Sequence, residues 1–396
     1  MIRTKVCIVG AGPAGACLSH FLSKEKIDHV LVDKASFPRD KVCGDGITLD
    51  ALNILRRLSP QLLKKFVESS DMLPSDGFCF HAPNGRELRY DFSHLDLPYA
   101  PFYTSRRVHL DSFLIENLPQ GYVRLLTEHK VVDITRIENG FEVQLEGEKI
   151  NELQCDYIIG AEGEKPIVSR CLGLTHFREK EHLCGALRVY YKGVEGLHKN
   201  NHLEFYIDKE ILPGGYFWIF PLSNGEANVG LGMISSEISK GKINLKKKLD
   251  YFITQHPTIS KMFKNAIPLE KPQGWGLPIV TSKRKITGDG YALIGDAAGM
   301  IEPLTGKGIG PGMVSARFLC EHLKEAISNN SKDLSDYESH MYRYYKSEMR
   351  LGYFAHRRLR KPWLISLIAD VSEWKPIHYL AQKKMDREWR KWIVKI

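Results

Sequence analysis

Three features are missing from this 396-residue sequence, and each absence excludes a class of protein. The eight cysteines form no CxxC pair and no cluster with metal-ligand spacing, so we expect neither a disulfide-stapled scaffold nor a metal site. No apolar run approaches the roughly 18 to 20 residues that a membrane span needs. The short apolar run near the N-terminus leads directly into glycines, which argues against a signal peptide and favours a cytoplasmic location.

Net charge is also missing from most of the chain. The total is +9, and the 14 basic and 5 acidic residues from position 343 onward account for all of it. The first 342 residues therefore carry equal numbers of each sign. Because no nucleic-acid-reading motif is present and most of the chain is neutral, we expect no nucleic-acid partner.

What the sequence does contain begins with a glycine-rich turn, GAGPAG at residues 10–15, between a buried strand and a helical stretch. Gly10 would allow the tight turn, Gly12 would let the backbone approach a pyrophosphate, and Gly15 would let the helix pack on the strand. The next strand ends at Asp33, which would accept hydrogen bonds from a ribose. These residues predict a dinucleotide site, and both NAD and FAD use such a unit.

Two later segments favour FAD. Residues 155–163 (CDYIIGAEG) resemble the middle motif of FAD-dependent hydroxylases, and the segment around Asp296 resembles their late motif. Asp296 would bind the ribityl chain or a pyrophosphate-bound water. Backbone N–H groups near Gly308 and Ile309 would meet the flavin, and a positive helix end there stabilises the anionic reduced form.

Two further motifs separate the chain from the hydroxylases. Residues 41–46 (KVCGDG) contain a cysteine-glycine loop, and residues 213–221 (PGGYFWIFP) match a PxxYxWxFP pattern at every fixed position. With them, the sequence resembles the geranylgeranyl reductase family, within the flavoprotein superfamily that includes para-hydroxybenzoate hydroxylase. Three residues depart from the family pattern, namely Asp33, Glu162 and Lys307.

This resemblance implies an FAD-dependent oxidoreductase that reduces carbon–carbon double bonds of an isoprenoid or prenyl lipid by hydride transfer from reduced flavin. A flavin-dependent monooxygenase or halogenase on the same scaffold is the alternative. The sequence leaves the electron donor open, as NAD(P)H or a carrier such as ferredoxin. The cofactor-binding residues expected from the motifs and the resemblance are Gly10, Gly12, Ala14, Gly15, Asp33, Cys43, Gly44, Arg107, Val131, Asp296, Gly308 and Ile309.

The aromatic residues of the PxxYxWxFP segment form the expected substrate wall. Tyr216, Trp218 and Phe220 alternate along an expected strand and so face one way. With Pro221 they are the predicted substrate-binding residues, although an aromatic core stripe is the simpler interpretation of the pattern alone. Cys43 is the catalytic candidate, either as a proton donor or as a shape element beside the flavin.

The expected fold is α/β, with a Rossmann-type FAD-binding domain, an inserted antiparallel β-sheet substrate domain and a helical C-terminal extension. The extension is basic and rich in tryptophan, which suits either peripheral association with an anionic membrane surface or a helix packed on the domain. The predicted ranges are 1–75, 104–180 and 281–335 for the FAD-binding domain, 76–103 and 181–280 for the substrate domain, and 336–396 for the extension. Antiparallel strands are expected at 182–191, 203–207, 215–221 and 227–233.

Overall fold

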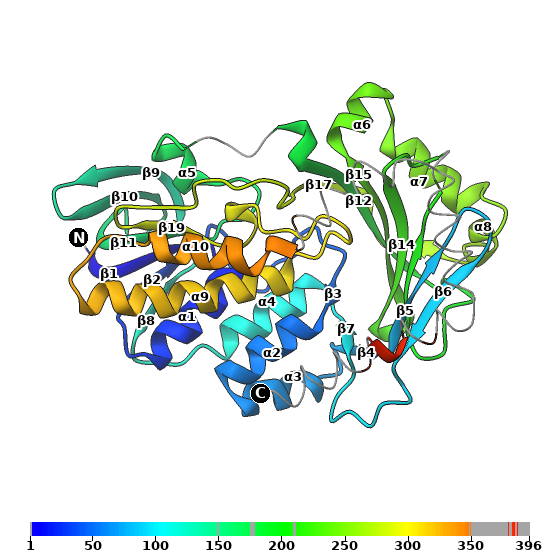
Figure 1. The fold of residues 1–396 in the computed structure, drawn as a ribbon, viewed down its shortest axis with the longest axis horizontal. Coiled ribbons are helices and arrows are strands. Elements are labelled where there is room, and N and C mark those ends of the chain that lie inside the picture. Colours follow the sequence, from blue (N-terminus) through cyan, green and yellow to red (C-terminus); the bar gives the residue numbers. More distant parts are fainter. Residues whose placement is uncertain are drawn as a thin grey trace.

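The computed structural model describes residues 2–148, 150–174, 179–208, 211–347 and 349, together with 379, 382–384 and 386. Two large sheets divide this part of the chain into two lobes, on the left and right of Figure 1. The tryptophans of the predicted C-terminal extension lie outside the described residues: Trp363, Trp374, Trp389 and Trp392.

The first sheet has the order β18-β19-β11-β1-β2-β8, and β10 and β9 extend from β11 as antiparallel neighbours. From β19 to β8 the strands run parallel, so their carboxyl ends share one edge, which is where open α/β sheets bind ligands. The strands are β1 (Ile2–Val9), β2 (His29–Val32), β8 (Val123–Leu126), β9 (Lys130–Ile137), β10 (Gly140–Glu146), β11 (Glu152–Gly160), β18 (Thr287–Gly288) and β19 (Tyr291–Leu293).

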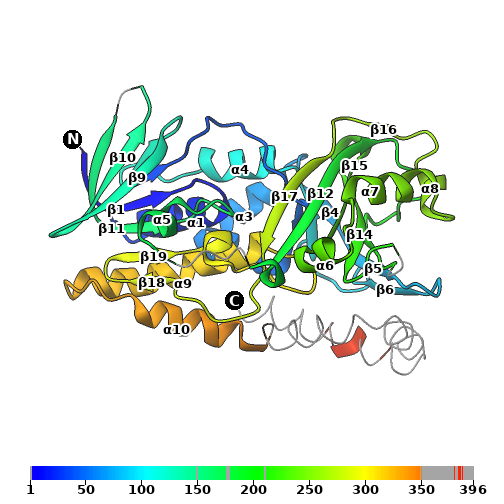
Figure 2. The same cartoon turned by 90° about the horizontal axis from the view of Figure 1, so that it is seen from above.

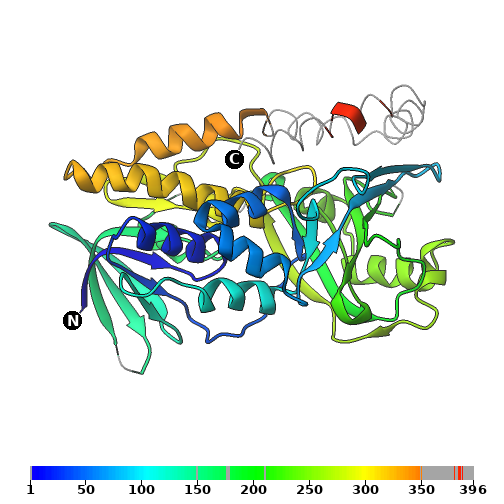
Figure 3. The ribbon, with the colours of Figure 1, turned by 90° about the horizontal axis from the view of Figure 1, so that it is seen from below.

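Helices cover this sheet. The end of β1 is a continuous apolar run that is buried, as expected for a parallel strand covered on both faces. Helix α1 packs against α9 and α4, and α10 lies along α9 at the edge of the lobe (Figure 3). The helices are α1 (Pro13–Lys24), α2 (Leu49–Leu58), α3 (Pro60–Val67), α4 (Arg107–Glu116), α5 (Ile167–Cys171), α9 (Ile309–Ser328) and α10 (Ser335–Tyr344), with a 3₁₀ turn η3 (Gly295–Ala298).

The second sheet has the order β16-β12-β15-β14-β13-β5-β6, and β17 pairs with β12. It is antiparallel except where β13 meets β5. Its strands are β5 (Gly77–His81), β6 (Glu87–Asp91), β12 (Leu183–Lys192), β13 (Leu203–Tyr206), β14 (Gly215–Leu222), β15 (Glu226–Ile234), β16 (Ile267–Pro268) and β17 (Gln273–Pro278). The four strands expected from the sequence are therefore present, with ends that differ by at most one residue.

The two faces of the second sheet have different neighbours. On its outer face α6 (Ser235–Lys240), α7 (Leu245–Thr254) and α8 (Ile259–Met262) pack, and Phe217 stacks on Phe252 at 4.6 Å between ring centroids. Its inner face is turned toward the first lobe, with β12 and β17 on that side (Figure 2).

A small sheet of β3 (Gly46–Ile47), β7 (Phe102–Thr104) and β4 (Leu73–Ser75) lies between the lobes. Two 3₁₀ turns, η1 (Lys180–His182) and η2 (Ser223–Gly225), complete the described elements. The architecture is thus mixed α/β, as predicted at that level. Among the described residues, no helix is both long and apolar enough to span a bilayer.

Candidate active site

A cavity of about 1430 Å³ extends from the carboxyl edge of the first sheet to the inner face of the second. All of the residues predicted to bind the cofactor line it except Gly15. The predicted substrate residues Tyr216, Trp218 and Phe220 also line it. Pro221 does not, and its carbonyl accepts a hydrogen bond from the Thr104 hydroxyl instead.

The glycine-rich turn is shaped by close backbone approach. Gly10 has a φ of +102°, and a Cβ atom there would lie 2.5 Å from the Ala161 carbonyl oxygen. A Cβ atom at Gly15 would overlap the Gly10 carbonyl oxygen, so Gly15 serves packing rather than the cavity surface. At Gly12, by contrast, there is room for a ligand, because the nearest side-chain atom to such a Cβ would be Arg107 Nη2 at 3.6 Å.

Gly12 is also the N-cap of α1, and among the described residues its position has no side-chain cap. The first N–H groups of α1 are therefore available to an anion beside Arg107. The site fits the pyrophosphate of a dinucleotide for three reasons: Gly12 has no Cβ, the N-terminus of α1 has no side-chain cap, and the Arg107 guanidinium is buried beside it. The turn at residues 10–15 therefore has the structural features that its sequence predicted.

Arg107 is held in place by an ion-pair network. Asp111 Oδ1 and Oδ2 accept hydrogen bonds from Arg107 Nε at 2.7 Å and Nη2 at 2.8 Å. Burial lowers the pKa of Arg107, but the charge and hydrogen bonds of Asp111 raise it above its ordinary value. Arg39 Nη1 lies 3.0 Å from Asp111 Oδ2, and its Nη2 lies 3.3 Å from Asp33 Oδ2. Arg39 was not predicted as a site residue, because no sequence motif surrounds it.

Asp33 ends β2 and closes the turn. Its Oδ2 accepts a hydrogen bond from the backbone N–H of Ala11 at 2.8 Å, and its Oδ1 accepts one from Ala35 at 3.0 Å. Val131, on β9, is buried beside the same part of the cavity. These contacts fix the carboxylate where an adenosine ribose would lie in this type of site.

The late motif lies at the N-terminus of α9. Gly308 is the N-cap of this 20-residue helix, and a Cβ there would lie 3.4 Å from Asp296 Oδ1. Lys41 Nζ lies 3.3 Å from Asp296 Oδ2. The unusual Lys307 has a partner in Asp50, whose Oδ2 lies 3.1 Å from Nζ and whose charge raises the pKa of the lysine.

Glu162, the departure in the middle motif, is used as a backbone acceptor. Its Oε1 accepts a hydrogen bond from the N–H of Val168, in the first turn of α5, at 2.7 Å. Burial raises the pKa of Glu162 to about 7, against the opposing effect of hydrogen bonds from Val168 and Ile167. A glutamate at this position thus anchors the start of α5.

The cysteine-glycine loop lies against the aromatic wall. A Cβ atom at Gly44 would lie 3.6 Å from Phe220 Cε2 and 4.0 Å from Trp218 Cε2, so a side chain here would touch both rings. Cys43 Sγ accepts a hydrogen bond from the Asp45 N–H at 3.3 Å. Burial, followed by the charge of Asp45, raises the pKa of the Cys43 thiol. Tyr216 donates its hydroxyl proton to the Thr305 carbonyl, which links the wall to the late motif.

Asn228 joins the loop to the wall and was not identified from the sequence. Its Oδ1 accepts a hydrogen bond from Trp218 Nε1 at 2.8 Å. Its Nδ2 donates to the Cys43 carbonyl oxygen and to Asp45 Oδ2, each at 2.8 Å. The Tyr190 hydroxyl donates a hydrogen bond to the same Asp45 oxygen at 2.7 Å. The aspartate of the CGDG motif was the only sequence signal of this arrangement.

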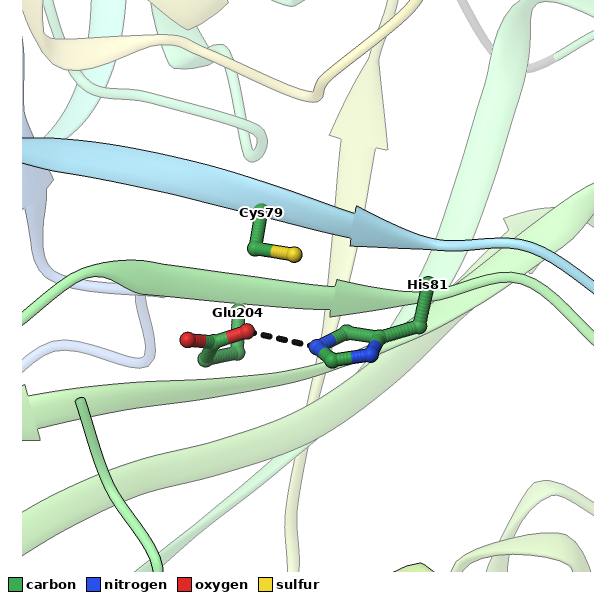
Figure 4. A group of neighbouring side chains, drawn as sticks. All are labelled: Cys79, His81 and Glu204. Atoms are coloured by element: carbon green, nitrogen blue, oxygen red, sulfur yellow. Dashed lines mark hydrogen bonds and ion pairs between the residues drawn. The ribbon is translucent and has the colours of Figure 1, made fainter. Parts of the chain in front are cut away.

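A second polar cluster lies on the outer face of the sheet, where Glu204 is flanked by Cys79 and His81 (Figure 4). His81 Nε2 lies 2.6 Å from Glu204 Oε2, and Arg89 Nη1 lies 3.0 Å from Glu204 Oε1. One donor atom from each of Cys79, His81 and Glu204 falls within 4.8 Å of the others, a spacing that a metal ion could use. Because Arg89 already neutralises Glu204, we interpret the group as an ion-pair cluster.

Comparison with known proteins places this geometry in a family. The model of the FAD binding domain family matches residues 3–346. A digeranylgeranylglycerophospholipid reductase of Methanopyrus kandleri is 31% identical over 342 residues, covering 83% of this chain and 79% of that protein. A menaquinone reductase of Mycolicibacterium smegmatis is 28% identical over 372 residues, covering 90% and 84%.

Among solved structures, a geranylgeranyl bacteriochlorophyll reductase-like protein from Thermoplasma acidophilum shares the fold. The TM-score is 0.82, at 22% identity, with 94% of this chain and 92% of that chain covered. The predicted FAD cofactor agrees with the family model, which spans both lobes. The chain therefore belongs to the geranylgeranyl reductase family of FAD-binding flavoproteins.

Proposed function

We propose that this enzyme reduces carbon–carbon double bonds of an isoprenoid chain that lies between the cysteine-glycine loop and the aromatic wall. The observation that carries the proposal is the continuous cavity, in which Gly44 approaches Trp218 and Phe220 and which extends to the dinucleotide site. Reduced FAD supplies the hydride for this chemistry. Relatives named for reduction of a prenylated phospholipid and of menaquinone support a prenyl lipid or prenyl quinone as substrate.

The chain's own residues would bind, orient and exclude water. The N-terminus of α1, Arg107 and Asp33 would hold the dinucleotide, and Asp296 and the N-terminus of α9 would hold the flavin end. The rings of Trp218 and Phe220 would confine a flexible apolar chain and keep water from the reacting carbons. Cys43, which lines the cavity next to Gly44, is the proposed proton donor.

The test is anaerobic incubation of the chemically reduced enzyme with geranylgeranyl phospholipid or menaquinone, followed by mass spectrometry. After air has reoxidised any quinol to the quinone, products should still be heavier by about two mass units per reduced chain bond, one hydride and one proton each. No such product from either lipid would contradict the proposal. Oxygen-dependent hydroxylation or halogenation of a substrate would instead support the alternative activity.

A pair of variants on one strand tests the wall. Phe220→Leu removes a ring from the cavity, and Phe217→Leu removes a ring from the outer face of the same strand. Among variants that retain FAD, only Phe220→Leu should raise the KM for the prenyl substrate, by about tenfold, because less apolar surface of the wall then packs on the isoprenoid chain. Equal effects of both changes would assign the stripe to the core, the simpler of the two interpretations.

We also infer that the chain is divided into an FAD-binding part and a substrate-binding part. An FAD-binding part of residues 1–75, 104–180 and 281–335 and a substrate part of 76–103 and 181–280 are supported by the membership of the two sheets. The basic extension, 336–396, would bring the enzyme to an anionic membrane surface. Removal of residues after 355 should weaken sedimentation with anionic liposomes, and equal binding by a truncated, FAD-loaded protein would contradict this role.

A further inference from the structure

Asp45, the acidic residue of the cysteine-glycine loop, is a buried carboxyl with an unusual environment. Its side chain is fully buried, and the residue contributes to the cavity lining beside Cys43. Oδ2 accepts the two hydrogen bonds from Tyr190 and Asn228. Oδ1 is buried and has no hydrogen-bond partner among the described residues. Burying a carboxylate whose oxygen lacks a hydrogen-bond partner costs much more free energy than burying a protonated carboxyl.

The backbone of Asp45 is held in a conformation that most side chains avoid. Its φ is +63°, in the left-handed region, between two glycines. An L-residue there costs roughly 1 kcal/mol or more relative to glycine. The loop therefore keeps an acid where a third glycine would be less strained, and in this conformation the Asp45 N–H donates a hydrogen bond to Cys43 Sγ, with N and Sγ 3.3 Å apart.

Neutral donors make the direct contacts with the carboxyl, and cations surround it at longer range. The direct donors are Tyr190 on β12 and Asn228 on β15. Arg188 on β12 and Arg107 on α4 act on it through charge alone. Burial raises the pKa of Asp45 to about 7, against the opposing effect of these four residues. At neutral pH the carboxyl therefore exchanges a proton readily.

We propose that Asp45 acts through Cys43, as the buried acid that returns a proton to the thiol after each turnover. This inference rests on the proposed double-bond reduction. Asp45 is a positioning and proton-supplying residue here, because its side chain is fully buried whereas Cys43 is partly exposed. Its backbone N–H bond to Cys43 Sγ also keeps the sulfur in place.

Each turnover consumes one proton, which passes from Asp45 to Cys43 and from Cys43 to the substrate. When one carbon of the double bond receives hydride, the other forms a C–H bond with the proton of the Cys43 S–H bond, which breaks and leaves a thiolate. Among the described residues neither Asp45 oxygen is hydrogen-bonded to Cys43 Sγ, so a water molecule must relay the proton. The Asp45 O–H bond breaks as the water takes its proton, the water gives a proton to the thiolate to form the new S–H bond, and a carboxylate remains. This direction is downhill, because burial and the charge of Asp45 raise the pKa of the thiol above its ordinary value. A proton from solvent restores the carboxyl before the next cycle.

The first experiment measures the coupling without any substrate. Oxidised holoenzyme is alkylated with iodoacetamide between pH 6 and 9, and modification of the Cys43 peptide is followed by mass spectrometry. Asp45→Asn removes the charge that raises the pKa of the thiol, so above pH 7 Cys43 should react several-fold faster than in the wild type. Glu204→Gln, on the outer face of the sheet, is the matched control and should leave the rate unchanged. Equal Cys43 rates in wild type and Asp45→Asn would overturn the proposal.

The second experiment separates proton return from geometry. In a single turnover of prereduced Asp45→Asn enzyme, Cys43 starts with its proton, so the rate should stay within about threefold of wild type. In steady state with excess chemical reductant, kcat should fall at least tenfold, since general acids contribute about 10²-fold or more. The KM for the prenyl substrate should not change. An equal fall in the single-turnover and steady-state rates would overturn proton return, because it would indicate a misplaced loop.

The two experiments distinguish failure of the inference from failure of the proposed function. If no prenyl substrate is reduced by the wild type, the proposed function fails, and with it proton return. The alkylation result still decides whether Asp45 controls the thiol. If the wild type reduces the substrate and Asp45→Asn turns over at the same steady-state rate, only the role of Asp45 is excluded.

Discussion

Two buried carboxyls associated with the second sheet differ in their chemistry. Asp45 contacts the inner face of the sheet and receives hydrogen bonds from a phenol and an amide. Glu204 lies on the outer face and contacts His81 and Arg89. Burial by itself would raise the pKa of both groups. At Glu204 the hydrogen bonds and charges of His81 and Arg89 more than reverse that effect, so its pKa lies below the ordinary value.

The difference shows that partners, rather than depth, decide which buried acid keeps its proton. Both side chains are at least nine-tenths buried, yet only Asp45 has a raised pKa. A cation at hydrogen-bond distance makes Glu204 a fixed charge, and its absence leaves Asp45 as an acid that titrates near neutrality. The inner face thus has a group suited to proton transfer, and the outer face has one suited to stability.

The largest effect should come from making Glu204 resemble Asp45. Arg89→Met removes the cation and leaves the buried carboxylate with His81 as its direct partner, which should lower the free energy of unfolding by about 3 kcal/mol. Urea denaturation at pH 7 measures this. The double variant Arg89→Met/Glu204→Gln should recover part of the loss, and the FAD-loaded fraction should keep its activity. A loss below about 0.5 kcal/mol would show that the pair is not needed.

A somewhat smaller effect should appear in the pH dependence of stability. Since the pKa of Asp45 rises from 3.8 to about 7 on folding, the folded state binds the proton more tightly than the unfolded state between those values. This contribution is complete below about pH 4 and is lost as the pH rises toward 7, at up to about 1.4 kcal/mol per pH unit.

Asp45→Asn lacks this contribution, so its stability relative to wild type should increase from pH 5 to pH 7 by about 2 kcal/mol. Because Glu162 titrates in the same direction in both proteins, the comparison removes its contribution. Urea midpoints at pH 5, 6, 7 and 8 measure the difference. A constant difference across this range would mean that Asp45 is ionised throughout.

The smallest effect should follow from Tyr190→Phe, which deletes one neutral donor. The ring remains between Arg106 and Arg188, at 4.1 and 3.8 Å from its centroid, so the packing is kept. Loss of the hydroxyl should move the apparent pKa of Asp45 upward by up to about one unit, corresponding to about 1.4 kcal/mol. Infrared difference spectra of the carboxyl C=O band against pH measure the shift. A downward shift would contradict the assigned hydrogen bond.

Local sequence was sufficient to predict the structural features that depend on short spacing. The glycine turn at 10–15 and the alternating rings of β14 depend on neighbours along the chain, where backbone geometry is set by residue type. The predicted residues accordingly line one cavity, apart from Gly15 and Pro221. The strand ends differed only slightly, since the turns around them are marked by glycine and asparagine.

Long-range contacts could not be obtained in this way. Asp45 lies 145 residues from Tyr190 and 183 from Asn228, and no periodicity connects them. Arg39 likewise acquires its role only when Asp111 is brought beside it by α4. The pKa of a buried acid depends on such contacts, so the sequence could show an aspartate between two glycines but not the state in which it is held.

Asn228 links the cysteine-glycine loop to the aromatic wall through hydrogen bonds to both. Its amide oxygen is bonded to Trp218 and its amide nitrogen to the loop, so neither end can move freely without losing a buried hydrogen bond. If a substrate displaces the Trp218 ring, Asn228 should therefore transmit the movement to the backbone of Cys43. Thermodynamic linkage is reciprocal, so any change of the loop that alters affinity for the substrate must be matched by an equal effect of the substrate on the loop.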